Sequence, residues 1–189
     1  DVDGPMVPAR VKFLPENLGH YYGWKFDPCA VSMLNFLGWA VPDLQIVIAS
    51  HRVGMRSPCD RSYTNTRASW SAIFKMNGLN IPIHKDWITD RSIDRRPKID
   101  EINGWLNEHQ GTTQFVTIDD EAAGHNDDVT QEQRDHLHLC GEDPLNGITW
   151  EDLIRALTFF GIDCQRGLTV LMHKYAIYTT ELNYENNDS

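Results

Sequence analysis

Two pairs of carboxylates, far apart in the sequence, are of the residue type that phosphoryl transfer requires. Asp1 and Asp3 stand two positions apart in the opening Asp-Val-Asp-Gly, and Asp119 and Asp120 follow the apolar run 114–118. One carboxylate can attack phosphorus and form an aspartyl phosphate, while a second protonates the leaving oxygen and later deprotonates water. Mg²⁺ prefers hard oxygen ligands and offsets the repulsion between carboxylates and phosphate. The two pairs together predict a magnesium-dependent phosphoryl-transfer site.

Such a site also needs a hydroxyl and a cation to hold the phosphoryl oxygens. Ser50 directly follows the apolar run 44–49 and supplies the hydroxyl, and Lys98, some twenty residues before the second acidic pair, supplies the cation. Each group alone has a more ordinary explanation, since a serine after a strand is usually a helix cap and paired acids are usually a solvated turn. Their common position after expected strands favours the functional interpretation.

The elements that must position these groups alternate along the chain. Apolar, β-branched runs predict buried strands, and 3.6-residue periodicity with capping residues predicts helices. Such alternation implies a parallel sheet with helices on both faces, with ligands bound at the carboxyl ends of the strands. The expected strands are 44–49, 114–118 and 137–139, with a short one at 81–83, and the expected helices are 28–40, 65–77, 97–106 and 149–160.

Composition narrows the class of protein. The chain has 189 residues, 41% of them apolar, which is enough for one domain with a core. The net charge of −10 argues against a chain that wraps long nucleic acid non-specifically. Residues 51–98 nevertheless hold ten Lys and Arg against four Asp and Glu, so this basic segment could contain an anion site. The four cysteines form no C-x-x-C pair and predict free thiols in a reducing cytoplasm, with disulfides as the less favoured alternative.

A zinc site is an alternative use of the segment His136-Leu137-His138-Leu139-Cys140. The H-x-H-x-C spacing matches no common zinc finger. The alternation of the segment is better explained by a strand that buries its two leucines.

The four groups resemble the motifs of the haloacid dehalogenase (HAD) superfamily over roughly residues 1–160. That family carries D-x-D-G after its first strand, Ser or Thr after the second, Lys at a later helix start and an acidic pair after the fourth. The stretches "IVIASHRVG" and "FVTIDDE" are similar to the phosphatase domains of polynucleotide kinase-phosphatases and to compact phage and bacterial HAD phosphatases of RNA repair or nucleotide metabolism. The resemblance implies an α/β Rossmann-like three-layer sandwich with a central parallel sheet and a small cap or none.

The resemblance also implies a role for each matching residue. Asp1 is the nucleophile and a metal ligand, and Asp3 is the general acid and base, whose backbone carbonyl also faces the metal. Ser50 and Lys98 bind the phosphoryl group, with Arg95 and Arg96 as rivals that fit the family pattern less well. Asp119 and Asp120 bind Mg²⁺, and Asp127 and Asp128 are lower-ranked metal acids. His51, Arg52 and Arg56 are expected to bind substrate.

One departure from the family concerns the segment before Asp1, where the family has an apolar strand that the sequence does not contain. Either residues upstream of Asp1 or another segment, such as 168–172 or 176–178, should supply this strand, and the upstream position is favoured. The whole chain, 1–189, is expected to be a single domain. Residues 4–26 and 51–97 are candidate substrate-facing inserts, and 163–189 a C-terminal extension.

Three functions are consistent with these residues. A nucleotide phosphatase, similar to a deoxynucleoside monophosphatase, is favoured because the acidic chain suits a small substrate better than a long polymer. A 3′-end phosphatase of nucleic acid repair is the alternative, and a HAD-like protein that only binds a partner is the third. The aspartyl-phosphate intermediate would equally allow transfer of the phosphoryl group to an acceptor other than water.

Overall fold

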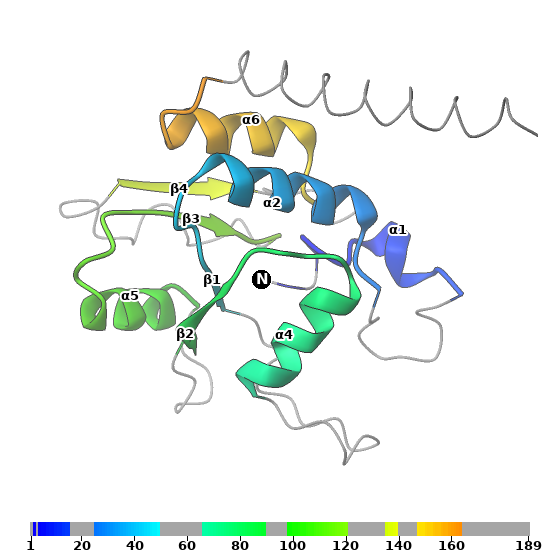
Figure 1. The fold of residues 1–189 in the computed structure, drawn as a ribbon, viewed down its shortest axis with the longest axis horizontal. Helices are drawn as coiled ribbons and strands as arrows, with labels where there is room; N and C mark the ends of the chain where they lie inside the picture. Colours follow the sequence, from blue (N-terminus) through cyan, green and yellow to red (C-terminus); the bar gives the residue numbers. More distant parts are fainter. Residues whose placement is uncertain are drawn as a thin grey trace, which may run out of the picture.

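The computed structural model describes Val2 and residues 4–15, 25–49, 66–89, 98–120, 135–139 and 147–163. These residues form short parallel strands covered by helices (Figure 1). The α/β alternation expected from the sequence is therefore present. Among the described residues, no helix is long and apolar enough to cross a membrane.

Three of the five described helices begin at a residue whose side chain caps them. Asp27 caps α2, Pro28–Ala40, by accepting a hydrogen bond from the amide of Cys29 at 3.0 Å, and Thr66 caps α4, Arg67–Met76. The last described helix, α6 (Trp150–Phe159), starts with a capping box between Thr149 and Asp152. The other two are α1, Ala9–Lys12, and α5, Lys98–Glu108.

Among the described residues, the strands form two parallel pairs, which agrees with the expectation of parallel strands. β1, Ile46–Ile48, pairs with β2, Ile83–Ile88, through an irregular register. β3, Gln114–Ile118, pairs in regular register with β4, Asp135–Leu139. Because each pair is parallel, its two strands end at the same edge. Polar residues that follow the two strands can therefore lie close together, as the expected site requires.

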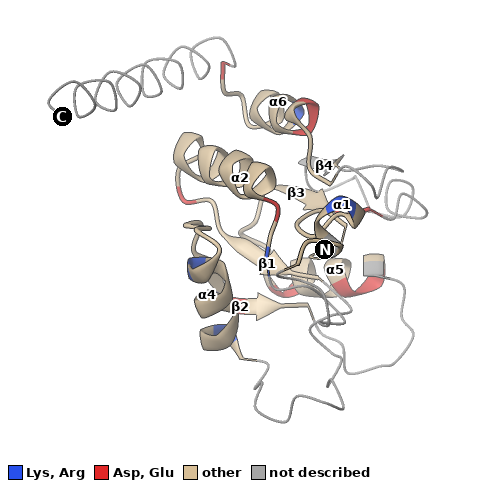
Figure 2. Cartoon of the chain, turned by 90° about the vertical axis from the view of Figure 1, so that its right-hand side faces the viewer, with Lys and Arg blue, Asp and Glu red and all other residues tan. Residues whose placement is uncertain are grey.

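Helices cover the strand pairs on more than one side. α2 packs against α6, and α6 packs against β4. α4 contacts β2, and α5 lies on the opposite side of β1 and β2 from α4 (Figures 1 and 2). The strands are thus sandwiched between helices, as the resemblance implied.

The core consists of two apolar clusters, one for each strand pair. The first joins the N-terminal segment, α2 and α4 to β1 and β2, and the second joins α2 and α6 to β4. Leu139 of β4 is fully buried in the second cluster, which agrees with the expectation that the leucines of this strand point inward. The side chains of His136 and His138, and Cys140 altogether, lie outside the described part, so the zinc alternative stays untested.

A cavity of about 510 Å³ lies between the two strand pairs. Residues 44–49, which contain β1, line one wall, residues 112–118, which contain β3, line another, and Val2, Pro5 and Met6 contribute from the N-terminal segment. A further parallel strand between β1 and β3 would join the two pairs into one sheet. The two possible sources of the apolar strand expected ahead of Asp1, residues upstream of it or the segments 168–172 and 176–178, lie outside the described residues, so this strand stays a prediction.

Hydrogen bonds tie the N-terminal segment to the rest of the fold. The amides of Met6 and Val7 donate to the carbonyl of Val2 at 3.0 and 3.2 Å and close a tight turn. The amide of Asp27 then donates to Met6 at 2.8 Å, and Arg10 forms an ion pair with the buried carboxylate of Asp27. The turn that carries the Asp-Val-Asp-Gly motif is therefore anchored to the start of α2.

Within the range 51–97, the helix expected over 65–77 is confirmed as α4, while the short strand expected at 81–83 begins later and is longer. Most of the described part of that range forms α4 and β2, which belong to the layered fold, and β2 runs over 83–88 instead of 81–83. The remainder of the range, and residues 16–24 of the first candidate insert, lie outside the described part, so the insert prediction stays open. Cys29 is a free, exposed thiol, as expected.

Candidate active site

The second acidic pair stands where β3 ends. Gln114–Ile118 is an apolar, β-branched strand, and the amide of Asp119 extends its ladder by donating to the carbonyl of Leu139 at 3.3 Å. Asp119 is fully buried, at 0% exposed, while Asp120 is half-buried. A carboxylate shielded from water needs hydrogen bonds, a cation or both to remain charged. The burial of Asp119 therefore fits a role in binding rather than in a solvated turn.

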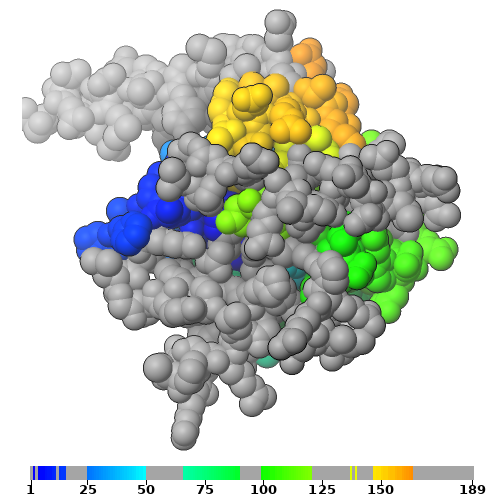
Figure 3. Space-filling view, turned by 180° about the vertical axis from the view of Figure 1, so that it is seen from behind, coloured from blue at the N-terminus to red at the C-terminus, as the bar shows by residue number. Residues whose placement is uncertain are grey.

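Gly4 brings the N-terminal motif against this acidic pair. Its backbone has φ +74°, and a Cβ built on it would lie 2.6 Å from the Cβ of Asp120 and closer still to the carboxylate. The side chain of Asp120 therefore fills the space that any residue other than glycine would need. Figure 3 shows the segment at the end of β3, in yellow-green, beside the dark blue N-terminal segment. Segments more than a hundred residues apart in sequence thus meet at one place.

Asp1 and Asp3 themselves lie outside the described residues, but their neighbours are placed. Val2 is buried, and Gly4 directly follows Asp3. The carbonyl of Pro5 accepts a hydrogen bond from the amide of Ile148 at 3.3 Å, so the turn also contacts the segment before α6. The expectation that the carboxylates of Asp1 and Asp119 lie about 4–5 Å apart, within reach of one Mg²⁺, stays a prediction.

Lys98 is the first residue of α5, at the helix start that the sequence predicted. The hydroxyl of Thr89, which directly follows β2, donates to the carboxylate of Glu101 in the first turn of α5 at 3.1 Å. Both residues are buried, and the amide of Thr89 donates to Ile48 at the end of β1. The start of α5 is therefore fixed at the carboxyl ends of β1 and β2, the edge where ligands bind in parallel sheets.

The remaining candidates fall on undescribed residues. These are Ser50, His51, Arg52, Arg56, Arg95, Arg96, Asp127 and Asp128. Within the basic segment, the described Arg67 donates to the carbonyl of Ile83 at 2.7 Å. Arg67 thus anchors α4 to the start of β2.

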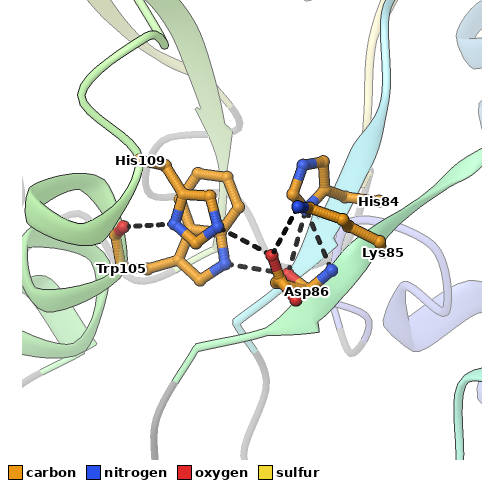
Figure 4. A network of polar contacts seen from close by, with 5 residues as sticks. All are labelled: His84, Lys85, Asp86, Trp105 and His109. Carbon is orange, nitrogen blue, oxygen red and sulfur yellow. Dashed lines mark hydrogen bonds and ion pairs between the residues drawn. The ribbon is translucent and has the colours of Figure 1, made fainter.

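A second polar cluster, not found from the sequence, joins β2 to the end of α5 (Figure 4). Nε2 of His109 lies 3.0 Å from Oδ2 of Asp86, and its Nδ1 donates to the carbonyl of Trp105 at 2.7 Å. The bond to Asp86 is the main cause that raises the pKa of His109, and it likewise lowers the pKa of Asp86. Two sequence patterns could have predicted this cluster. His84 and Asp86 alternate along β2, and Trp105 and His109 are four residues apart.

Comparison with known proteins decides the family. The chain matches the family described as the HAD domain in Swiss Army Knife RNA repair proteins, over residues 1–153. The chain belongs to this HAD family. No curated protein and no solved structure matches it significantly.

Membership of the HAD family confirms three expectations from the sequence. The resemblance is confirmed, the α/β HAD-like fold is confirmed, and the protein is a phosphatase of the hydrolase class. The match spans both the N-terminal motif and the acidic pair after β3, which the contact between Gly4 and Asp120 joins in space. The roles of individual residues within this HAD domain stay predictions.

Proposed function

We propose that this HAD domain is a Mg²⁺-dependent phosphomonoesterase that acts through an aspartyl phosphate on the phosphorylated end of RNA. The observation that carries the chemistry is the meeting of the Asp-Val-Asp-Gly turn with the acidic pair after β3, through Gly4 and Asp120. The family description, which refers to RNA repair proteins, supports the class of substrate.

The carboxylates of this edge suit Mg²⁺. Asp119 and Asp120 offer hard oxygen ligands at the end of β3, and the sequence motif adds the carboxylate of Asp1 and the backbone carbonyl of Asp3. When bound, the ion supplies the positive charge that allows an anionic phosphate to approach several carboxylates. The complete burial of Asp119 supports this use, because a buried carboxylate gains most from a cation in a site shielded from water.

The reaction has two balanced steps. The carboxylate of Asp1 attacks phosphorus, the bond from phosphorus to the ester oxygen breaks, and Asp3 donates its proton to that oxygen. Water then attacks the phosphorus of the aspartyl phosphate, Asp3 takes a proton from the water, and phosphate leaves as the carboxylate of Asp1 is restored. Two carboxyl groups therefore suffice for both half-reactions.

Ser50 and Lys98 hold the phosphoryl oxygens in this scheme. Lys98 opens α5, so the amides of the first helical turn add positive potential at the same place. The hydrogen bond between Thr89 and Glu101 keeps that turn at the sheet edge. His51, Arg52 and Arg56 then contact the rest of the substrate, where arginine suits phosphate groups.

A nucleoside monophosphate is the second candidate substrate. The net charge of −10 favours a small anion over a long polyanion, because repulsion grows with the number of phosphates brought near the protein. Both candidates share the terminal phosphomonoester, and they differ in what must be bound beside it.

Phosphate release from a substrate panel tests the proposal. The panel holds a generic aryl phosphate, nucleoside monophosphates, and short RNAs with a 3′- or a 5′-phosphate, each with Mg²⁺ and with EDTA. We expect the highest kcat/KM for an RNA end, loss of turnover in EDTA, and loss of at least about 10³-fold in Asp119→Asn. Asp100→Asn, which changes an exposed carboxylate in the first turn of α5, serves as the matched control.

The outcomes separate the hypotheses. A preference for nucleoside monophosphates over RNA ends would move the assignment to the second substrate. Activity that persists in EDTA would contradict the metal requirement. A folded wild-type protein that turns over no phosphomonoester would support a HAD domain that only binds a partner.

A further inference from the structure

Three side chains that can bind metal converge at the far end of α5. His84 and Asp86 are on β2, on the same face because side chains two residues apart in a strand point the same way, and His109 directly follows α5. One ligand atom from each residue lies within 4.8 Å of the other two. Figure 4 shows the three side chains facing one another across the gap between β2 and the helix.

Hydrogen bonds already orient this His-Asp-His cluster. The carbonyl of Trp105 can only accept, so Nδ1 of His109 must carry the proton, and Nε2 is the atom that faces Asp86. The indole of Trp105 stacks on the imidazole of His109 at 3.7 Å with an interplanar angle of 8°, and its N–H donates to the carbonyl of Asp86 at 2.8 Å. A backbone carbonyl that fixes the far nitrogen of an imidazole is the usual support of a metal-binding histidine.

The ring of His84 is held in place from its own strand. Nδ1 of His84 lies 3.1 Å from the amide nitrogen of Asp86, from which it accepts a hydrogen bond, and 3.3 Å from the carbonyl oxygen of the same residue. A neutral imidazole has one acceptor nitrogen, so a metal bound at Nδ1 would replace the bond from this amide. The ring packs edge-on against those of Trp105 and His109. His109 is 18% exposed and Asp86 52%, so the cluster is open to ions in solution. Two further charges lie near, Lys85, whose Nζ is 3.9 Å from Oδ2 of Asp86, and Glu108.

We propose that His84, Asp86 and His109 bind a divalent transition-metal ion of the Zn²⁺ type. Two imidazoles and one carboxylate suit Zn²⁺ and its neighbours, whereas Mg²⁺ prefers oxygen ligands alone. Ligand atoms around a tetrahedral Zn²⁺ with bonds near 2.1 Å are about 3.4 Å apart, so small side-chain rotations of the open cluster complete the geometry. The ion would replace the proton shared by His109 and Asp86, and water would complete its coordination.

This site is separate from the phosphatase site. α5 has eleven residues and is therefore about 16 Å long, with Lys98 at its start and His109 just beyond its end. A metal at the cluster would fasten the end of α5 to β2, as the bond between Thr89 and Glu101 fastens its start. We therefore assign the metal a structural role, independent of the proposed reaction.

Calorimetric titration of the metal-free chain with Zn²⁺, in excess Mg²⁺ to occupy the acidic edge, tests the site. We expect the wild type to bind Zn²⁺ and to gain several degrees in Tm at saturation, since an ion that binds the folded state stabilises it. His84→Ala and Asp86→Asn should each weaken this binding by at least roughly tenfold. Glu108→Gln, next to His109 but outside the cluster, should bind like the wild type.

Two results decide against the proposal. Equal Zn²⁺ affinity in the wild type, His84→Ala and Asp86→Asn would place the ion elsewhere on the chain, and absence of binding to the wild type would leave the cluster as hydrogen bonds alone. X-ray absorption of the Zn²⁺ complex gives a readout that does not depend on stability, with two imidazole ligands expected. Circular dichroism of the metal-free variants checks that each is folded.

Discussion

At the scale of single residues, Gly4 and Asp120 carry the clearest constraint on the candidate site. Gly4 has a positive φ, which favours glycine. The side chain of Asp120 lies against the Cα of Gly4, in the space that a Cβ would occupy. The glycine of the Asp-Val-Asp-Gly motif is therefore required for two reasons, the backbone conformation and the approach of the acidic pair. Asp119, buried beside it, gives the edge a carboxylate that water does not reach.

Replacing Gly4 by alanine is expected to abolish most activity, because the new methyl group would displace Asp120. The left-handed backbone adds a destabilisation of about 1–2 kcal/mol. Gly78→Ala is the matched control, since Gly78 has φ +77° and nothing within 4 Å of a built Cβ. The activity of both variants is measured as the rate of phosphate release, and their stability by denaturant unfolding. Equal loss of activity in both would show that backbone strain, and not the contact with Asp120, is responsible.

At the scale of elements, α5 is held at both ends against β2. Thr89 and Glu101 join at its start, and the carbonyl and carboxylate of Asp86 hold Trp105 and His109 at its end. The helix start matters for function because Lys98 opens it. Two acidic residues, Asp100 and Glu101, lie in the first turn of α5, which is labelled in Figure 2. Displacement of α5 along β2 would therefore move the predicted phosphate ligand.

Thr89→Val should lower stability by about 1–3 kcal/mol, because the buried carboxylate of Glu101 loses a hydrogen-bond donor. We also expect a higher KM, since the start of α5 is less well fixed. Thr158→Val is the control, because the hydroxyl of Thr158 donates to a carbonyl at an exposed site. Urea unfolding and steady-state kinetics measure the two effects. A normal KM with reduced stability would limit Thr89 to a structural role.

The capping box of α6 gives a prediction for stability alone. Thr149 accepts from the amide of Asp152, and Asp152 accepts from the amide and hydroxyl of Thr149. Thr149→Ala is expected to cost about 1 kcal/mol through loss of the cap. A shift of the urea midpoint without a change in kcat is the expected result, and a fall in kcat would show that this end of α6 contributes to the site.

At the scale of the whole molecule, the net charge of the chain and the proposed RNA substrate lead to opposite expectations for binding. A net charge of −10 repels long RNA, while the family description points to RNA repair. The two are compatible if binding is confined to the terminal phosphate and a few neighbouring nucleotides. Repulsion from more distant phosphates is screened beyond a Debye length of about 8 Å at physiological salt.

A length series of 3′-phosphorylated RNAs tests this balance. We expect kcat/KM to reach a plateau within a few nucleotides and to depend only weakly on salt, because few phosphates are contacted. Single nucleotides that match the plateau would favour the nucleoside monophosphate hypothesis. A rate that rises steadily with length and falls steeply with salt would instead indicate an extended basic binding surface.

The sequence alone determined the family, the α/β alternation and most element bounds, because these depend on local patterns. The range of β3 was predicted from an apolar run, the start of α5 from Pro97 to within one residue, and α2 from Pro28 and its periodicity. The motif order, with Asp1 first and Asp119 last, predicted the phosphatase class that the family match confirms.

Only the tertiary structure decided which distant residues meet. Asp120 fills the space beside Gly4, and His109 reaches Asp86, because parallel strands and crossing helices bring residues together that are far apart in the chain. The parallel pairing of β1 with β2 and of β3 with β4 also joins segments far apart in the chain, which no local pattern encodes. Local sequence thus predicted the kind of site, and the packing of α5 on β2 brings together the residues of the proposed metal site.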